Sequence, residues 1–199
     1  MQLIPDDPML GRGALPNYRR WMAMAVAGGG WMCDYTVWPL NYFLQHGRVL
    51  PYDGAITTYM GASPVLVSGS GDEYRRMVHQ MGQTAAKLVD RQKWLNENSP
   101  ELFKKSVNWS DGVALQELRK SVSKDMFKLR GDVVERARLM RDDGSFDCDV
   151  SNGKRAVFFR GLAGTPQENR GAQARKFLNS WRTACGVGQA AELQGATHL

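Results

Sequence analysis

The chain has 199 residues, of which 43% are hydrophobic, a composition that is typical of soluble globular proteins and excludes a chain that is disordered throughout. Its formal charge is +6, and residues 150–199 carry most of the excess, with seven basic and two acidic residues. This imbalance favours an acidic partner, whether nucleic acid, anionic lipid or protein, without selecting among them.

The three cysteines, Cys33, Cys148 and Cys185, are odd in number and far apart in the sequence, and no two of them form a C-x-x-C pair. This spacing argues against a zinc module and against a disulfide framework. We therefore expect reduced thiols, and a soluble protein that resides in a reducing compartment or within a macromolecular assembly.

Residues 1–69 are predicted to form an irregular arm with loops, rich in aromatic residues, glycine and proline. Within this arm, Arg19 and Arg20 precede an apolar run, as at an export signal or the start of a membrane span. The run ends at Gly28–Gly30 after seven residues, whereas a spanning helix needs about 20 apolar residues. Protein packing is therefore favoured, and contact of residues 21–44 with a membrane surface remains an alternative.

A capping box at Ser70 and Glu73 predicts the start of a helix, because each side chain can satisfy a backbone N–H that has no partner within the first turn. The helix is expected to end before Pro100, where a shorter helix through about Val107 would begin. The preceding segment, Val65–Gly71, could instead present backbone N–H groups to a phosphate. That alternative is weak, because the segment has no lysine and the first helical turn is acidic.

Between Ser110 and Asp143, eight apolar residues recur three or four positions apart and predict one long amphipathic helix. At 1.5 Å per residue this helix would be about 45 Å long. It is longer than one small core can cover, so a helical bundle or partner chains are expected along its length. The eight residues are Leu115, Leu118, Val122, Met126, Leu129, Val133, Ala137 and Met140.

Phe146, Cys148 and Val150 alternate with polar residues, Asn152 and Gly153 can form a tight turn, and Ala156–Phe159 can return as the partner strand. This pattern predicts a small antiparallel β-hairpin near residues 146–159. A second capping box, at Thr165, predicts the start of a basic C-terminal helix that ends near Gly186.

Together these elements predict a mainly α fold: a helical bundle with one long central helix, a small antiparallel β-hairpin and an irregular, aromatic-rich N-terminal arm. The arm would comprise residues 1–69 and the helical domain residues 70–199. The predicted core consists of Met77, Met81, Leu88, Leu118, Val122, Leu129, Val133, Phe177 and Trp181.

Basic residues of the C-terminal third are the best candidates for a binding surface. Arg175 and Arg182 lie seven positions apart and therefore share one face of the predicted helix. The alternative is a solvated face opposite the apolar stripe of the same helix. The predicted surface comprises Lys154, Arg155, Arg160, Arg170, Arg175, Lys176 and Arg182.

No motif specifies a reaction, and neither a cofactor nor a metal site is predicted. Four aspartates crowd residues 142–149, but their spacing does not match an EF-hand loop. Cys33, His46 and Asp53 have the residue types of a thiol hydrolase without its local signature. Glu73 and Asp53 are the acids that a cell-wall glycan hydrolase would use.

The leading hypothesis is a non-enzymatic structural or assembly subunit of a larger complex, such as a phage virion, a tail or a secretion-type assembly. Its partners would be other protein chains in a homo- or hetero-oligomer. The alternatives are a cell-wall glycan hydrolase and a nucleic-acid-binding module that uses the basic C-terminal third. The residues expected at the subunit interface are Trp21, Trp31, Trp38, Leu115, Leu118, Val122, Met126, Leu129, Val133 and Met140.

Overall fold

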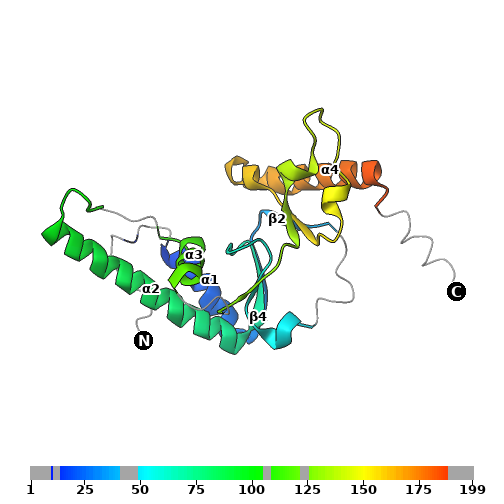
Figure 1. Cartoon of the computed structure of the whole chain (residues 1–199). Coiled ribbons are helices and arrows are strands. Elements are labelled where there is room, and N and C mark those ends of the chain that lie inside the picture. Colours follow the sequence, from blue (N-terminus) through cyan, green and yellow to red (C-terminus); the bar gives the residue numbers. More distant parts are fainter. Residues whose placement is uncertain (1–9, 11–13, 41–48, 105–108, 122–125, 188–199) are drawn as a thin grey trace. The chain divides into compact units, whose positions relative to one another are not determined.

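The computed structural model shows an α+β fold and describes residues 10, 14–40, 49–104, 109–121 and 126–187 (Figure 1). Of these residues, 54% are helical and 16% lie in the strands of two mixed sheets. The predicted mainly α bundle is therefore wrong. The chain forms two compact units: unit 1 contains Met1–Cys33 and His46–Arg130, and unit 2 contains Asp34–Gln45 and Gly131–Leu199.

Unit 1 combines three helices with a four-stranded sheet whose strand order is β1-β4-β3-β5. β1 pairs with β4 and β3 with β4 in antiparallel fashion, whereas β3 and β5 are parallel. The elements are α1 (Ala14–Val26), β1 (Gly29–Cys33), the 3-10 turn η2 (Pro51–Gly54), β3 (Thr57–Thr58), β4 (Leu66–Ser70), α2 (Gly71–Asn98), α3 (Asp111–Ser121) and β5 (Lys128–Leu129).

The helix predicted from Ser70 is confirmed as α2, which has 28 residues. The Ser70 hydroxyl accepts a hydrogen bond from the Glu73 N–H at 3.3 Å, as the capping box predicts. The Glu73 carboxylate binds elsewhere: it accepts from the Ile56 N–H at 3.2 Å and from the Arg76 guanidinium. After α2, the helix predicted from Pro100 is wrong, since Leu102 N–H donates to the Ser99 carbonyl in a turn; residues 105–108 lie outside the described chain.

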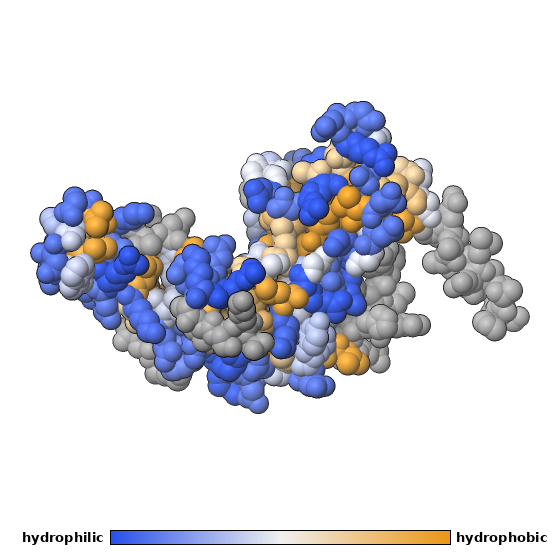
Figure 2. Space-filling model, in the orientation of Figure 1, coloured by the Kyte–Doolittle hydropathy of each residue, from blue (hydrophilic) through white to orange (hydrophobic). Residues whose placement is uncertain are grey.

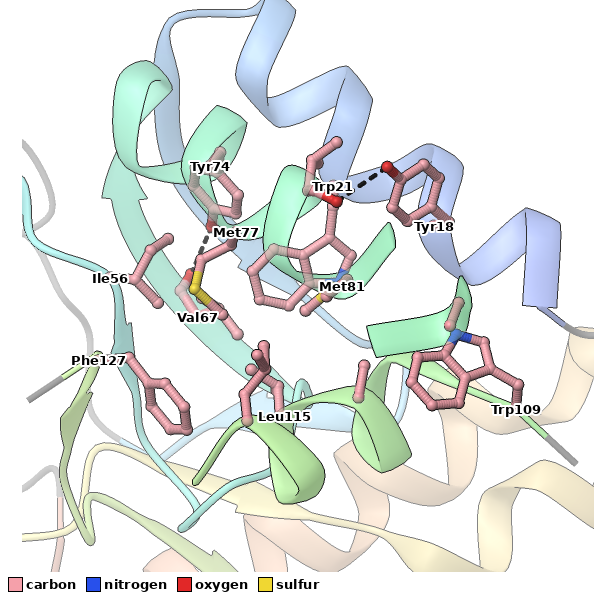
Figure 3. Packing of buried hydrophobic residues seen from close by; sticks show 14 of the residues in the cluster. Tyr18, Trp21, Ile56, Val67, Tyr74, Met77, Met81, Trp109, Leu115 and Phe127 are labelled. Atoms are coloured by element: carbon pink, nitrogen blue, oxygen red, sulfur yellow. Dashed lines mark hydrogen bonds between the residues drawn. The ribbon is translucent and has the colours of Figure 1, made fainter. Parts of the chain in front are cut away.

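The core of unit 1 lies where α1, α2 and α3 meet the sheet. Trp21 of α1, Met81 of α2 and Leu115 of α3 point toward the same interior space (Figure 3). The Trp21 indole N–H donates to Asp111 Oδ2 at 2.9 Å, which satisfies the polar atom of a fully buried ring. The Tyr18 hydroxyl donates to the Val78 carbonyl at 2.9 Å, and burial raises the pKa of Tyr18 to about 12.

The long central helix predicted between Ser110 and Asp143 is wrong. α3 ends at Ser121, and the chain then enters β5 of unit 1 and β6 (Val133–Glu135) of unit 2. Leu115 and Leu118 face the core of unit 1, but Val133 extends a sheet of unit 2. The stripe of apolar residues is therefore divided between the two units, and the adjacent β-branched residues Val133 and Val134 favour a strand over a helix.

Unit 2 has a three-stranded sheet with strand order β2-β7-β6, covered by one long helix, α4 (Gln167–Cys185). β2 and β7 are antiparallel, and β6 and β7 are parallel. The helix is anchored by Ala174, Leu178 and Trp181, all of them buried. The remaining elements are β2 (Val37–Pro39), η3 (Arg136–Leu139), η4 (Asp149–Ser151), β7 (Ala156–Phe158) and η5 (Arg160–Gly164).

The hairpin predicted at residues 146–159 is also wrong. Phe146 forms a single antiparallel bridge with Met140, and the strand that follows, β7, pairs with β2 and β6. Gly153 does occupy the predicted turn, at φ +70°. In this sheet Val157 of β7 is fully buried in a cluster that includes Leu178 and Trp181 of α4, whereas an isolated hairpin would leave it more exposed.

A disulfide joins Cys148 to Cys185, with a Cα–Cα distance of 5.4 Å, so the prediction of reduced thiols is wrong for these two residues. Cys33 is exposed and lies outside the disulfide. The predicted C-terminal helix is confirmed: α4 ends at Cys185, and Gly186 follows it as a C-cap in the left-handed conformation. Its predicted capping bond from Thr165 is wrong, because Pro166 is the N-cap residue and no side chain caps the helix.

Most of the predicted core is confirmed. Met77, Met81, Leu118, Val133 and Trp181 are buried, whereas Leu88 and Phe177 are half-buried. Leu129 is exposed, and Val122 lies outside the described residues.

Candidate binding cleft

A cleft of about 340 Å³ opens on the surface of unit 2, between α4 and the segments that pack against it. Figure 2 shows apolar surface exposed beside hydrophilic side chains on this unit. Half of the lining is apolar and half is polar or charged. The apolar residues are Phe146, Phe159, Leu162 and Phe177, and the others are Arg136, Gln173, Lys176 and Ser180.

Three phenyl rings form the apolar part of the cleft. The ring centroid of Phe177 lies 5.3 Å from that of Phe146 and 5.3 Å from that of Phe159, and both pairs meet edge to face. Phe159 is 2% exposed and Leu162 4% exposed, so they form the bottom, whereas Phe146 and Phe177 are half-buried and form walls. These mutual contacts hold the apolar surface in place before anything binds.

One stripe of α4 supplies the opposite side. Gln173, Lys176, Phe177 and Ser180 recur at helical spacing and therefore face the same side of the helix. Ser180 donates its hydroxyl to the Lys176 carbonyl at 3.1 Å, within the helix. Phe177 was expected from the apolar pattern, but the polar residues beside it come to the cleft only through the packing of α4.

Two cations stand at the rim. The Arg136 guanidinium lies over the Phe177 ring, 5.0 Å from its centroid, and the exposed Lys176 also lines the cleft. Among the described residues, no carboxylate lies within ion-pair distance of either cation. The acidic neighbours already have partners: Glu135 pairs with Arg160 at 3.1 Å and Asp147 with Arg141 at 3.8 Å.

The disulfide braces the cleft. Cys148 lies two residues beyond the Phe146 wall, and Cys185 is the last residue of α4. The bond therefore ties the segment that carries Phe146 to the helix that supplies the opposite side. The two walls, at Phe146 and Phe177, are 31 positions apart in the sequence. The disulfide restrains the distance between them in the folded chain.

The structure distributes the predicted basic surface over several environments. Of its seven residues, Lys176 is the one that lines the cleft. Arg155 pairs with Asp132 at 3.0 Å, and Lys154 Nζ donates to the Gly131 carbonyl at 2.5 Å. Arg170 lies over the Tyr35 ring, at 4.7 Å from its centroid. The others are Arg160, in its ion pair with Glu135, exposed Arg175 and half-buried Arg182.

Four of the ten residues expected at a subunit interface are buried within the chain itself. Trp21, Leu115, Leu118 and Val133 are buried, and they are therefore not available to a partner as the chain is folded. Trp31, Trp38 and Met126 are half-buried, Leu129 and Met140 are exposed, and Val122 lies outside the described residues.

Sequence reasoning missed Arg136, Phe146 and Phe159 as site residues. Arg136 falls in the predicted long helix, and the two phenylalanines fall in the predicted hairpin. The sequence feature that could have indicated the two phenylalanines is the cluster of phenylalanines in a basic segment, which is typical of an aromatic binding surface as well as of a core.

The candidate thiol hydrolase residues do not form a described site. Cys33 is at the end of β1 and Asp53 lies in η2, both exposed, whereas His46 lies outside the described residues. Asp53 and its neighbour Tyr52 adopt left-handed conformations, with φ of +53° and +51°.

Glu73 is held in a structural network. Arg76 donates to both oxygens of its carboxylate at 2.8 Å, and the same guanidinium donates to the Met126 carbonyl at 2.7 Å. These hydrogen bonds lower the pKa of the Glu73 carboxyl below its ordinary value of 4.5. A general acid of a glycan hydrolase needs a raised pKa, so this environment opposes that role.

We predict that, because of this network, the free energy of unfolding of unit 1 falls as the pH becomes acidic. Because the folded-state pKa of Glu73 is depressed, its stabilisation is fully present above about 4.5 and is lost as pH falls through the lower folded-state value. Glu73→Gln should therefore reduce the loss of the free energy of unfolding measured by urea titration between pH 5 and pH 3. An unchanged pH dependence in this variant would contradict the assignment, and Glu117→Gln, an exposed pair with Lys120, is the control.

Neither the alternative of a phosphate-binding loop at Val65–Gly71 nor that of a cation site at the aspartate cluster gains support. The Gly71 N–H, at the start of α2, donates to the Gly28 carbonyl at 3.0 Å and is therefore already used. Within the described part of the chain, no group of three or more histidine, cysteine or acidic residues could hold a metal ion. No helix in the same part is long and apolar enough to cross a membrane.

Comparison with known protein families, curated proteins and solved structures finds no match to this chain.

Proposed function

We propose that this protein is a non-enzymatic assembly subunit that binds another protein chain through the cleft of unit 2. The observation that carries the proposal is the pairing of an apolar floor with rim cations that no described carboxylate neutralises. Protein interfaces place aromatic and arginine side chains in such pockets, where they supply most of the binding energy. A rigid, preformed pocket also lowers the entropy lost on binding.

The two alternatives have less support. The hydrolase would need Glu73 or Asp53 as an acid, but Glu73 is an ionised partner of Arg76 and Asp53 is exposed. A nucleic-acid module would need cations that follow a phosphate backbone. Several of the predicted basic residues instead bind carboxylates or backbone carbonyls of the chain itself, which weakens that proposal.

The disulfide modifies the proposed location. Cys148 and Cys185 would remain oxidised in an extracellular, periplasmic or virion-surface setting, whereas a reducing compartment would open the bond. We therefore favour an assembly that matures under oxidising conditions over the reducing compartment expected from the cysteine spacing.

Site-specific photo-crosslinking tests the proposal. A benzophenone amino acid at Gln173, on the cleft rim, should yield one discrete protein adduct in the native source, and Lys176→Glu should abolish it. The same amino acid at Gln167, exposed on α4 outside the cleft, is the matched control. Equal adducts from both positions, adducts to nucleic acid alone, or no adduct would overturn the proposal.

A further inference from the structure

We infer that the cleft of unit 2 recognises an acidic segment of its partner protein, in which one aromatic or large aliphatic side chain stands next to a carboxylate. This inference rests on the proposed function and specifies the chemistry of the bound segment. The cleft would take the apolar side chain, and Arg136 and Lys176 would bind the carboxylate.

The size and depth of the cleft favour a single apolar anchor. Its volume of about 340 Å³ lies at the small end of the range for ligand pockets, about 300–1,000 Å³. Nearly fully buried Phe159 and Leu162 close the bottom, so an inserted side chain would meet apolar atoms on several sides. The rings of Phe146 and Phe177 already meet edge to face, an arrangement that a further aromatic ring can extend.

The positive charge of the rim favours a carboxylate next to the apolar anchor of the bound segment. Arg136 is held over the Phe177 ring, which orients the guanidinium without neutralising it. Glu135, the carboxylate next to Arg136 in the sequence, is engaged by Arg160, and Asp147, next to Phe146, is engaged by Arg141. A carboxylate that enters with the anchor would therefore meet two cations and little opposing charge, and charge-assisted hydrogen bonds to it would be strong.

The arrangement favours an acidic protein segment over a nucleic acid. The cleft has two cations beside one apolar pocket, whereas a phosphate backbone requires successive cations along a track. Arg175 is exposed on α4 but does not line the cleft, although it is the sequence neighbour of Lys176. This pair of adjacent cations separates the two partner classes, because a polyanion would use both and a cleft-bound carboxylate would use Lys176.

Fluorescence anisotropy of the full chain with three labelled peptides tests the inference. The first peptide carries one phenylalanine flanked by glutamates, the second has glutamines in place of the glutamates, and the third has alanine in place of phenylalanine. We expect the first peptide to bind at least about tenfold more tightly than either of the others, as expected for a charge-assisted contact and a buried anchor. Equal binding of the first two peptides would overturn the inference.

Matched variants locate the binding. Lys176→Glu and Arg136→Glu should each lower the affinity for the first peptide at least about tenfold. Arg175→Glu and Arg138→Glu, which change exposed cations outside the cleft, should alter this affinity less than about twofold. Ser180→Phe should block the cleft while replacing an exposed residue, and circular dichroism would verify that the variant folds. Equal losses in Lys176→Glu and Arg175→Glu, or displacement of the peptide by a short oligothymidylate, would overturn the inference in favour of a polyanion.

The outcomes also separate this inference from the proposed function. A discrete Gln173 adduct that depends on Lys176, combined with no preference for the glutamate peptide, would overturn the acidic-segment chemistry and leave the protein-binding cleft standing. Loss of the adduct would overturn both.

Discussion

Cys148→Ser is expected to lower the free energy of unfolding of unit 2 by about 4 kcal/mol. The disulfide joins residues 37 positions apart. Its removal raises the conformational entropy of the unfolded chain, because the loop between these residues is no longer closed. Urea unfolding followed through tryptophan fluorescence, to which Trp38 and buried Trp181 contribute from unit 2, would measure the loss. Because Cys148 anchors the Phe146 wall, the affinity of the cleft for the glutamate peptide should fall in the same variant.

The remaining cysteines provide the controls for this prediction. Cys185→Ser should destabilise unit 2 as much as Cys148→Ser, and the double variant should equal either single variant, since all three remove the same bond. Cys33→Ser should leave the unfolding of unit 2 unchanged, because Cys33 belongs to unit 1 and is outside the disulfide. Wild-type stability that is insensitive to a reducing agent able to open the bond would contradict the prediction.

Gly29→Ala is expected to cost unit 1 at least about 3 kcal/mol, since both its conformation and its surroundings exclude a side chain. Gly29 has φ of +100°, which an L-residue rarely adopts. A Cβ atom there would lie 2.6 Å from the Gly71 nitrogen and press against the Gly69 carbonyl oxygen. These are backbone atoms of β4 and of the start of α2, and they can move only by disturbing the pairing of β1 with β4.

Gly28→Ala is the matched control for this effect. Gly28 also has positive φ, at +87°, but no heavy atom lies within 4 Å of the position that a Cβ would take. It should therefore cost only the conformational strain, about 1 kcal/mol. Thermal unfolding of both variants, followed by circular dichroism, would compare them. Equal destabilisation would show that the close approach of β1 to the start of α2 is not what requires glycine at position 29.

Local signals in the sequence predicted the two long helices well. Ser70 caps α2 by a hydrogen bond within its own first turn, and Gly186 ends α4 by adopting a left-handed conformation. Both signals act over a few residues, so they are readable without knowledge of the rest of the fold. The apolar spacing likewise placed Met77, Met81 and Trp181 in the cores.

The same kind of pattern failed where the chain passes from one unit to the other. Between Ser110 and Asp143, apolar residues recur at helical spacing, yet Leu118 packs in unit 1 and Val133 in a strand of unit 2. Spacing records that residues are buried but not which partner buries them. The pairing of β7 with β2 and β6 outweighed the local turn at Gly153 in the same way.

The sequence by itself determined where α2 and α4 begin or end and which of their faces are apolar, because these depend on hydrogen bonds and periodicity within one segment. Only the tertiary structure decided the two units, the disulfide and the cleft. Arg136, Phe146, Phe159 and Phe177 come from four separate stretches of sequence, and they meet because α4 packs on the sheet of unit 2. Such long-range contacts depend on the burial of distant residues against one another, which no local pattern encodes.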